Sequence, residues 1–212
     1  MQLYFAPLAC SMASRIALYE AAAEAQLTYV DTRSKLVSNG GSFWDINPMG
    51  QVPVLITDDG RKVTENVAVL QVIADAYPDA QLAPPPASPE RAALHQWLNF
   101  ITTELHKGTF IPLLDKTSNE GARDYARAKA PLRFEVLNRH LTGRDYLLDR
   151  YSIADAYLFT VLNWGQASQI DLTPWPAVQA FYTRTAARPA VTRALAEEFQ
   201  LYREEAARRQ AA

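Results

Sequence analysis

Residues 80–89 read AQLAPPPASP, and this stretch divides the chain. Three consecutive prolines, Pro84–Pro86, fit neither a helix nor a central strand, because proline lacks the amide hydrogen that both structures use. We therefore interpret residues 80–87 as a linker between two domains, residues 1–79 and residues 88–212. A chain of 212 residues is long enough for two compact domains, each with its own core.

The segment before the linker alternates short apolar strands with helices. The pattern predicts strands at residues 3–5, 27–30, 52–56 and 62–63, and helices at residues 12–23 and 67–76. Between the last two strands, Asp58-Asp59-Gly60 is a turn sequence typical of a hairpin. This segment is therefore expected to form a small α/β domain.

The segment after the linker is predicted to be helical throughout. Ser88-Pro89-Glu90 supplies an N-cap, a proline at the first helical position and an acid in the first turn. Helices are expected at residues 89–110, 122–141 with a kink or break at Pro131, 153–162, 178–187 and 191–207. Ser152 and Asp155 have the spacing of a capping box, and the polar residues 197–210 are expected to be a solvated helix face.

Composition excludes several classes of protein. Twenty-one Lys and Arg against 23 Asp and Glu give a net charge of −2, which disfavours nucleic acid as a partner. No apolar stretch approaches the roughly 20 residues that span a bilayer, and no basic segment opens a secretory signal, so no membrane partner is expected. The single cysteine allows neither an intramolecular disulfide nor a multi-cysteine metal site, and it fits a reducing cytoplasm.

Cys10 lies between a predicted strand and a helix that opens near Ser11. Free N–H groups and the helix dipole favour a negatively charged sulfur at such a position. A buried, inert cysteine is the alternative, but a loop at the C-terminal edge of a sheet is more often an open site than a core. Thioredoxin-type motifs carry C-x-x-C, whereas Cys10-Ser11-Met12-Ala13 has no resolving cysteine. An internal dithiol cycle is therefore excluded, and a mixed disulfide with an external thiol stays open.

Four short motifs indicate one family when they are taken together. They are Cys10 at the first turn, Asn47-Pro48 before Gly50-Gln51-Val52-Pro53, Thr64-Glu65-Asn66 at a helix start, and Ser152-Ile153-Ala154-Asp155 in the helical half. With these motifs the chain resembles a bacterial glutathione S-transferase, specifically of the beta class, over essentially its whole length. The resemblance implies the glutathione transferase fold, an α/β thioredoxin-like N-terminal domain plus an all-α C-terminal domain, and a homodimer.

The resemblance also assigns roles to individual residues. Cys10 and His106 are implied to be catalytic, although a lone histidine on a helix is more often an ordinary polar residue. The residues implied to bind glutathione are Lys35, Val52, Pro53, Glu65, Asn66, Asn99, Glu104 and Lys107. Phe110, Leu113 and Trp164 are candidates for the pocket of the second substrate, although such residues at helical spacing more often form core.

Local chemistry is consistent with several of these roles. Val52-Pro53 before an apolar run suits a cis-proline turn, which leaves the Val52 backbone free to pair with a short peptide such as glutathione. Glu65 and Asn66 place an acid and an N-cap residue at a helix start, where an ammonium and a carboxylate can both bind. The family usually has a serine at position 66, so Asn66 is a departure. Asn99, Thr103 and His106 are spaced to share one helix face.

The expected reaction is attack of the glutathione thiolate on a small hydrophobic electrophile, a detoxification reaction, or thiol–disulfide exchange through Cys10. In the dimer, Asn99 and Glu104 are expected to approach the neighbour's glutathione. No metal is expected, and no cofactor apart from glutathione as co-substrate. The alternative is a non-catalytic binding or regulatory protein on the same fold, either of the stringent-starvation type or a carrier of apolar ligands. Retention of the glutathione-binding set favours an enzyme.

Overall fold

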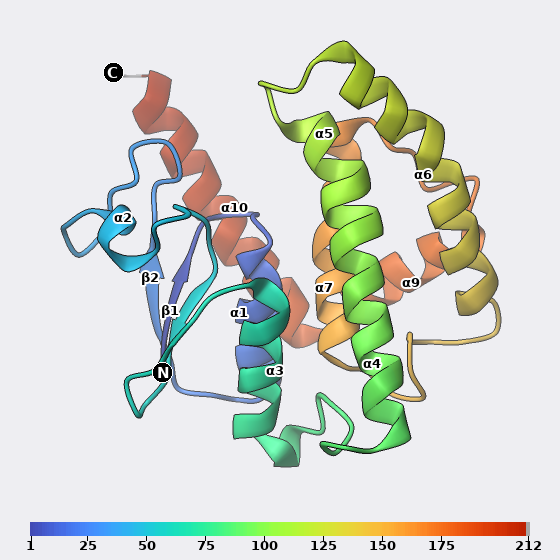
Figure 1. The fold of residues 1–212 in the computed structure, drawn as a ribbon, viewed down its shortest axis with the longest axis horizontal. Coiled ribbons are helices and arrows are strands. Elements are labelled where there is room, and N and C mark those ends of the chain that lie inside the picture. Colours follow the sequence, from blue (N-terminus) through green and yellow to red (C-terminus); the bar gives the residue numbers. More distant parts are fainter. Residues whose placement is uncertain (211–212) are drawn as a thin grey trace. The chain divides into compact units, whose positions relative to one another are not determined.

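The computed structural model describes residues 1–210, and these residues form two compact units (Figure 1). One unit contains Met1–Leu82 together with the chain from Arg188 onward, and the other contains Ala83–Ala187. The helical periodicity of residues 191–207 places the last helix in the predicted helical domain, residues 88–212. By its contacts, this helix, α10 (Pro189–Gln210), belongs to the first unit and packs against α1 (Ser11–Glu20).

The first unit is built on a four-stranded sheet with the order β2-β1-β3-β4. Its strands are β1 (Gln2–Phe5), β2 (Gln26–Tyr29), β3 (Val54–Ile56) and β4 (Lys62–Val63). The first two strands are parallel, and β3 pairs antiparallel with both β1 and β4. Besides α1 and α10, its helices are α2 (Phe43–Ile46), α3 (Asn66–Ala76) and the 3₁₀-helix η1 (Pro78–Ala80). The predicted thioredoxin-like α/β unit is confirmed.

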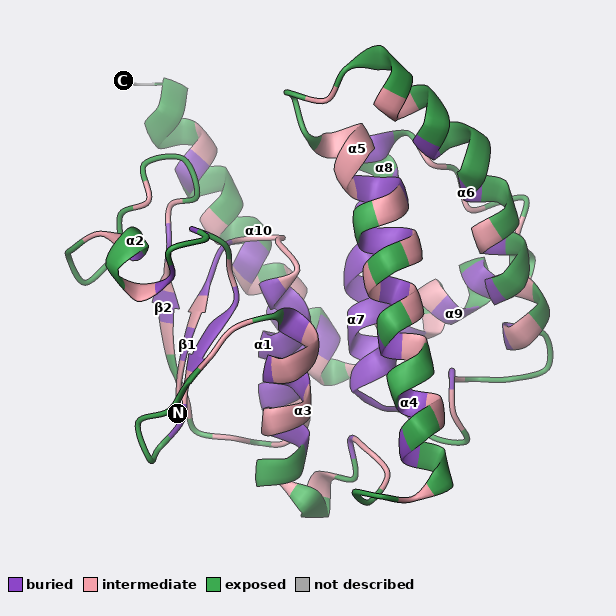
Figure 2. Cartoon of the chain, viewed as in Figure 1, coloured by how far each residue is buried: buried purple, intermediate pink, exposed green. Residues whose placement is uncertain are grey.

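The core of this unit fills the space between the sheet and its helices. Leu3 and Phe5 on β1 are buried and alternate with half-buried residues, as expected for a strand with one face on the core. The apolar residues of α1 and α3 that face each other are buried in turn (Figure 2). They include Met12, Ile16, Val69, Leu70 and Ile73. Burial of one such side chain stabilises a fold by roughly 1.5–3 kcal/mol, so this core fixes the start of α1 beneath the Cys10 loop.

The second unit is all helical, as predicted. Its elements are α4 (Pro89–Phe100), the π-helix η2 (Ile101–Phe110), α5 (Ile111–Leu114), α6 (Glu120–Leu141), α7 (Ile153–Leu162), α8 (Gly165–Ser168) and α9 (Pro176–Ala186). α7 is buried along its whole length and is the central helix of this unit (Figure 2). No helix within residues 1–210 combines the length and the apolar character needed to cross a membrane.

Two of these helices have features that the sequence predicted, a proline inside α6 and a capping box at the start of α7. Of the kink or break predicted at Pro131, the break is wrong, because α6 runs through this exposed proline as one helix. The predicted capping box is confirmed: the Asp155 carboxylate accepts hydrogen bonds from the Ser152 amide and hydroxyl, both at 2.8 Å, and from the Leu147 amide at 2.9 Å. Three donors to one fully buried carboxylate fix the start of α7.

Candidate functional site

Cys10 occupies the N-cap position of α1 and is half-exposed. Its Sγ donates a hydrogen bond to the Val52 carbonyl oxygen at 3.3 Å. The peptide bond between Val52 and Pro53 is cis, which confirms the expected cis-proline turn. The lone thiol therefore lies directly beside the backbone that precedes β3, at the N-terminus of a helix whose dipole favours negative charge.

Lys35 lies close to the same turn. Its backbone has a φ of +57°, and its ammonium group donates to the Gly50 carbonyl at 2.7 Å. The ammonium also lies 5.5 Å from the centre of the Trp44 ring. Gly50 has a φ of +58°, and a Cβ added there would lie 2.6 Å from the Trp44 ring, so any larger residue would strain the turn and displace the indole. Trp44 was not identified from the sequence, and nothing in the spacing around it distinguishes it from an ordinary exposed aromatic residue.

Glu65 and Asn66 form the start of α3, but not in the predicted way. The N-cap residue is Glu65, which is exposed and has a φ of +64°, and Asn66 is the first residue inside the helix. The Asn66 side chain is buried against α1, where its Oδ1 accepts a hydrogen bond from the Ser14 hydroxyl at 2.9 Å. The N-cap prediction for Asn66 is therefore wrong, because its side chain turns into the core and braces α3 against the helix that carries Cys10.

Glu198 on α10 contacts the loop that carries Cys10, and no sequence motif indicated it. Its Oε2 accepts a hydrogen bond from the Leu8 amide at 2.7 Å, and its Oε1 lies 3.8 Å from the Arg15 guanidinium. Burial raises the pKa of Glu198 to about 8. The expectation that residues 197–210 form a solvated face is thus wrong for Glu198, and also for Glu205, which is buried too. A usable signal existed, since Val191, Ala194 and Glu198 recur at helical spacing.

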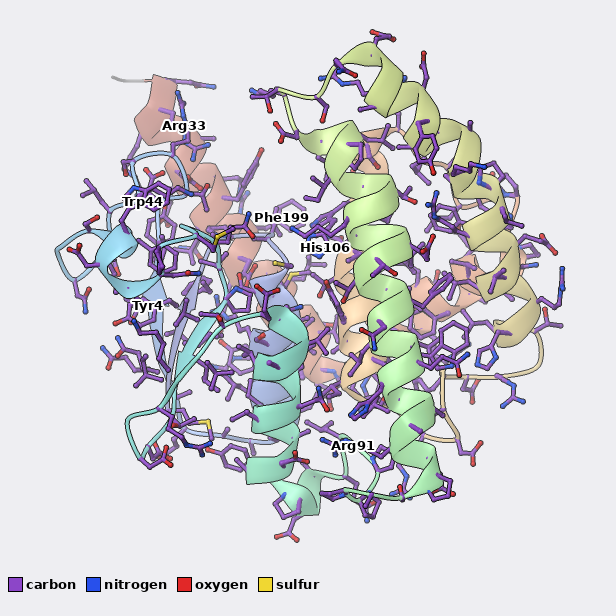
Figure 3. The ribbon with its side chains drawn as sticks, in the orientation of Figure 1. Tyr4, Arg33, Trp44, Arg91, His106 and Phe199 are labelled. Carbon is purple, nitrogen blue, oxygen red and sulfur yellow. The ribbon has the colours of Figure 1, made fainter. Side chains whose placement is uncertain are left out.

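His106 is buried. It lies on the η2 segment of the second unit (Figure 3). Its Nδ1 lies 2.6 Å from the Tyr157 hydroxyl oxygen, and its ring centre lies 5.0 Å from that of Trp164. Burial lowers the pKa of His106 to about 4, and the charge of Lys107 adds to this effect. The imidazole is therefore neutral at physiological pH.

The predicted polar face of Asn99, Thr103 and His106 does not form. Asn99 and Thr103 are exposed whereas His106 is buried. The reason is the π-helix, in which hydrogen bonds close over five residues and shift the faces relative to an α-helix. The sequence offers no signal for this change, because its apolar spacing fits an α-helix.

The remaining predicted residues of this unit have varied surroundings. Lys107 is exposed, and the Glu104 carboxylate pairs with Arg133 at 2.8 Å. Phe110 is fully buried and packs its ring against Phe134 and Trp164, with centre-to-centre distances of 6.3 and 5.9 Å. Phe110 and Trp164 thus belong to an aromatic cluster that also contacts His106. Leu113 is half-buried, on α5.

Two family comparisons cover most of the chain. Residues 9–76 match the glutathione S-transferase N-terminal domain, and residues 84–189 match the glutathione S-transferase C-terminal domain. Among curated relatives, glutathione S-transferase GstA of Escherichia coli O157:H7 is 42% identical, over 93% of this chain and 98% of the relative. Glutathione S-transferase GST-4.5 of Xanthomonas campestris pv. campestris is 34% identical, with the same two coverages, 93% and 98%.

Solved structures agree with these matches. A ternary complex of BphK, a bacterial glutathione S-transferase, is 45% identical with a TM-score of 0.90, and it covers 93% of this chain and 99% of its own. A sphingomonad glutathione S-transferase complexed with glutathione is 38% identical with a TM-score of 0.89, covering 93% and 98%. The beta-class glutathione S-transferase of Sphingomonas chungbukensis is also 38% identical, with a TM-score of 0.89. The match covers 93% of this chain and 98% of that enzyme. The resemblance to bacterial beta-class enzymes is confirmed.

Proposed function

Because the chain belongs to the glutathione S-transferase family, we propose that its first unit binds glutathione and that the enzyme conjugates glutathione, through its sulfur, to small hydrophobic electrophiles. The observation that carries this proposal is the 3.3 Å contact between the Cys10 thiol and the Val52 carbonyl at a cis-proline turn. A peptide that pairs with the Val52 backbone brings its own cysteinyl sulfur next to the start of α1, where the helix dipole stabilises a thiolate.

The charged ends of glutathione suit the groups on either side of this turn. We assign the glycyl carboxylate to Lys35, whose ammonium lies at the Gly50 carbonyl. The γ-glutamyl ammonium is assigned to Glu65, and the γ-glutamyl carboxylate to the free N–H groups of α3 at Asn66. The sphingomonad glutathione S-transferase, which is 38% identical, is complexed with glutathione, and this supports glutathione as the ligand here.

Conjugation forms a bond between the glutathione sulfur and an electrophilic carbon, and the electrophile loses its leaving group or opens its ring. The thiol proton is released to solvent before or during attack, so the enzyme must stabilise a thiolate. We assign His106 as a hydrogen-bond donor to this sulfur. Its low pKa means that it acts as a neutral imidazole and not as a cation. Lys107, Asn99 and Glu104 stay proposed glutathione contacts, the last two across a homodimer.

A second proposed activity is thiol–disulfide exchange through Cys10. The Cys10 thiolate attacks the glutathione sulfur of a mixed disulfide, releases the other thiol and becomes glutathionylated. A second glutathione thiolate then attacks the Cys10–glutathione bond, which regenerates Cys10 and forms oxidised glutathione. This cycle needs no resolving cysteine, in keeping with a single cysteine in the chain.

The test is calorimetric titration of the wild-type protein and Glu65→Gln with reduced glutathione. The substitution removes the charged partner of the ammonium, a loss of about 1.5–3 kcal/mol, so binding should weaken roughly 10- to 100-fold. Glu24→Gln changes an exposed glutamate of the same unit and should bind like wild type. Equal affinity in all three proteins would refute the assignment of Glu65.

A panel of electrophiles then identifies the reaction class. Aryl halides, epoxides, peroxides and mixed disulfides, each offered with glutathione, separate conjugation from exchange. Binding of glutathione without turnover of any of them would favour the alternative of a binding protein on the same fold.

A further inference from the structure

The hydroxyl of Tyr157 and the imidazole of His106 form a buried pair within the second unit. Tyr157 lies on α7 and His106 on η2, and both are at most 6% exposed. The distance from Oη to Nδ1 is 2.6 Å, and the two rings meet edge to face at 89° with centres 5.9 Å apart. The contact ties one specific ring nitrogen of His106 to a fixed group.

A neutral imidazole carries one N–H donor and one acceptor nitrogen, so the partner of one nitrogen determines what the other can do. A phenol hydroxyl is a stronger donor than a neutral imidazole N–H, and the imidazole lone pair is a stronger acceptor than a phenol oxygen. The favoured hydrogen bond therefore runs from the Tyr157 hydroxyl to Nδ1. That bond leaves the ring proton on Nε2.

We propose that Tyr157 is a positioning residue that holds His106 in the Nε2–H form, so that Nε2–H is the donor offered to the glutathione sulfur. The inference rests on the role of His106 in the proposed function and extends it to a residue that no sequence motif indicated. With the opposite tautomer, Nε2 would present a lone pair, which cannot donate to a thiolate.

The surroundings of His106 hold the ring in this orientation. Trp164 packs against the imidazole at 64° with ring centres 5.0 Å apart, so the indole opposes a ring flip, which would place Cδ2 where Nδ1 now meets the Tyr157 hydroxyl. The π-helix also keeps its register. The Thr109 hydroxyl donates to the Glu104 carbonyl five residues earlier at 2.8 Å, and a Cβ at Gly108 would lie 2.6 Å from the Thr103 carbonyl oxygen. Burial additionally keeps the ring neutral, so the tautomer matters at physiological pH.

The first experiment measures the tautomer directly. The ring nitrogens of His106 are observed by ¹⁵N NMR in wild-type protein and in Tyr157→Phe, which keeps the ring and removes the hydroxyl. We expect wild type to carry its proton on Nε2, and Tyr157→Phe to show a mixture of both tautomers. A wild-type proton on Nδ1 would overturn the proposal, whether or not the enzyme is active.

The second experiment links the tautomer to catalysis. For an electrophile that wild type conjugates, Tyr157→Phe should lower kcat about tenfold and change KM for glutathione less than twofold. Tyr182→Phe is the matched control, because it removes another tyrosine hydroxyl of the same unit. The Tyr182 hydroxyl donates to Asn163 Oδ1 at 3.0 Å and not to His106. The control should keep wild-type kcat. An unchanged kcat in Tyr157→Phe would overturn the proposal.

A double-mutant cycle separates positioning from a general structural effect. In a His106→Gln background, Tyr157→Phe should no longer lower kcat, because the residue acts through His106. An undiminished effect in that background would show that Tyr157 acts by another route. If His106→Gln alone leaves kcat unchanged, the role of His106 in the proposed function is refuted. The tautomer measured by NMR is independent of that outcome, so the two failures can be told apart.

Discussion

Cys10 and His106 differ in what surrounds them, and this difference decides what each can do at neutral pH. The Cys10 thiol is half-exposed and touches one backbone carbonyl at the start of a helix. The His106 ring is buried among aromatic residues and stays neutral. Only the former can form a covalent bond with an external thiol, so the two proposed activities depend on Cys10 to different degrees.

Cys10→Ala should abolish thiol–disulfide exchange, because no other thiol exists in the chain. Conjugation should fall by less, since the nucleophile there is the thiol of glutathione itself. Both activities are assayed in both proteins, and intact mass spectrometry after incubation with oxidised glutathione detects the covalent adduct. Full exchange activity in Cys10→Ala would show that Cys10 is a structural residue.

Burial of His106 should make stability depend on pH. Its pKa is about 4 in the folded protein against about 6.5 when unfolded, so the unfolded chain binds the extra proton first as the pH falls. The stabilising contribution is complete above pH 6.5 and is lost as the pH falls toward 4. Between pH 7.5 and pH 5 we expect wild type to lose about 2 kcal/mol of unfolding free energy relative to His106→Gln. Urea unfolding measures this change. The same difference in unfolding free energy between the two proteins at pH 7.5 and at pH 5 would contradict a buried neutral ring.

At the scale of elements, α10 secures the loop that carries Cys10. Its Glu198 accepts the Leu8 amide at 2.7 Å, two residues before the thiol. Arg188 at the entrance to α10 pairs with Glu20 at the end of α1, at 2.7 Å. These two contacts hold α10 along α1. A substitution in α10, such as at Glu198, is therefore expected to disturb the loop before Cys10.

Glu198→Gln tests this anchor. The amide keeps an oxygen for Leu8 but cannot ionise. A carboxyl whose folded pKa is raised to about 8 contributes stability that is present below its unfolded value and is lost as the pH rises through 8. From pH 5 to pH 7.5, wild type should therefore lose about 3 kcal/mol relative to the glutamine variant in urea unfolding. An unchanged difference between the two proteins over this range would mean that Glu198 is ionised in the fold.

The elements also show where sequence patterns succeed and fail. The strands, α7 and the capping box followed from apolar spacing and cap chemistry, because those signals are local. The π-helix was missed, since residues 101–110 have ordinary α-helical spacing and the change of register depends on packing around Gly108 and Arg133. Membership of α10 in the first unit was missed because periodicity identifies a helix but not the partner that covers it.

The same limit applies to the candidate site. Cys10, the cis bond before Pro53 and the helix start at Glu65 were predictable, because each has a local backbone signature. Glu198, Trp44 and Tyr157 were not, since each matters through a residue distant in sequence. Resemblance identified His106, but only the structure shows that the ring is buried, which lowers its pKa.

At the scale of the whole molecule, the chain places its proposed glutathione contacts in both units, and Asn99 and Glu104 are expected to serve the neighbour's site. This expectation requires that the chain form a dimer, and a stable dimer needs exposed apolar residues that association can bury. Tyr125, Leu132 and Val136 are exposed on α6 by 61, 68 and 40%. Their spacing of seven and four residues places them on one face of the helix, beside Arg133, which pairs with Glu104.

We therefore expect wild type to sediment as a dimer at micromolar concentration, and Leu132→Glu combined with Val136→Glu to sediment as a monomer, because two buried carboxylates would oppose association. Tyr202→Glu alters another exposed aromatic residue, on α10 and 46% exposed, and serves as the control that should stay dimeric. If the partner completes each site, the monomeric variant should also bind glutathione more weakly than the control. A wild-type protein that sediments only as a 23.7 kDa species would contradict the dimer and, with it, the assignment of Asn99 and Glu104.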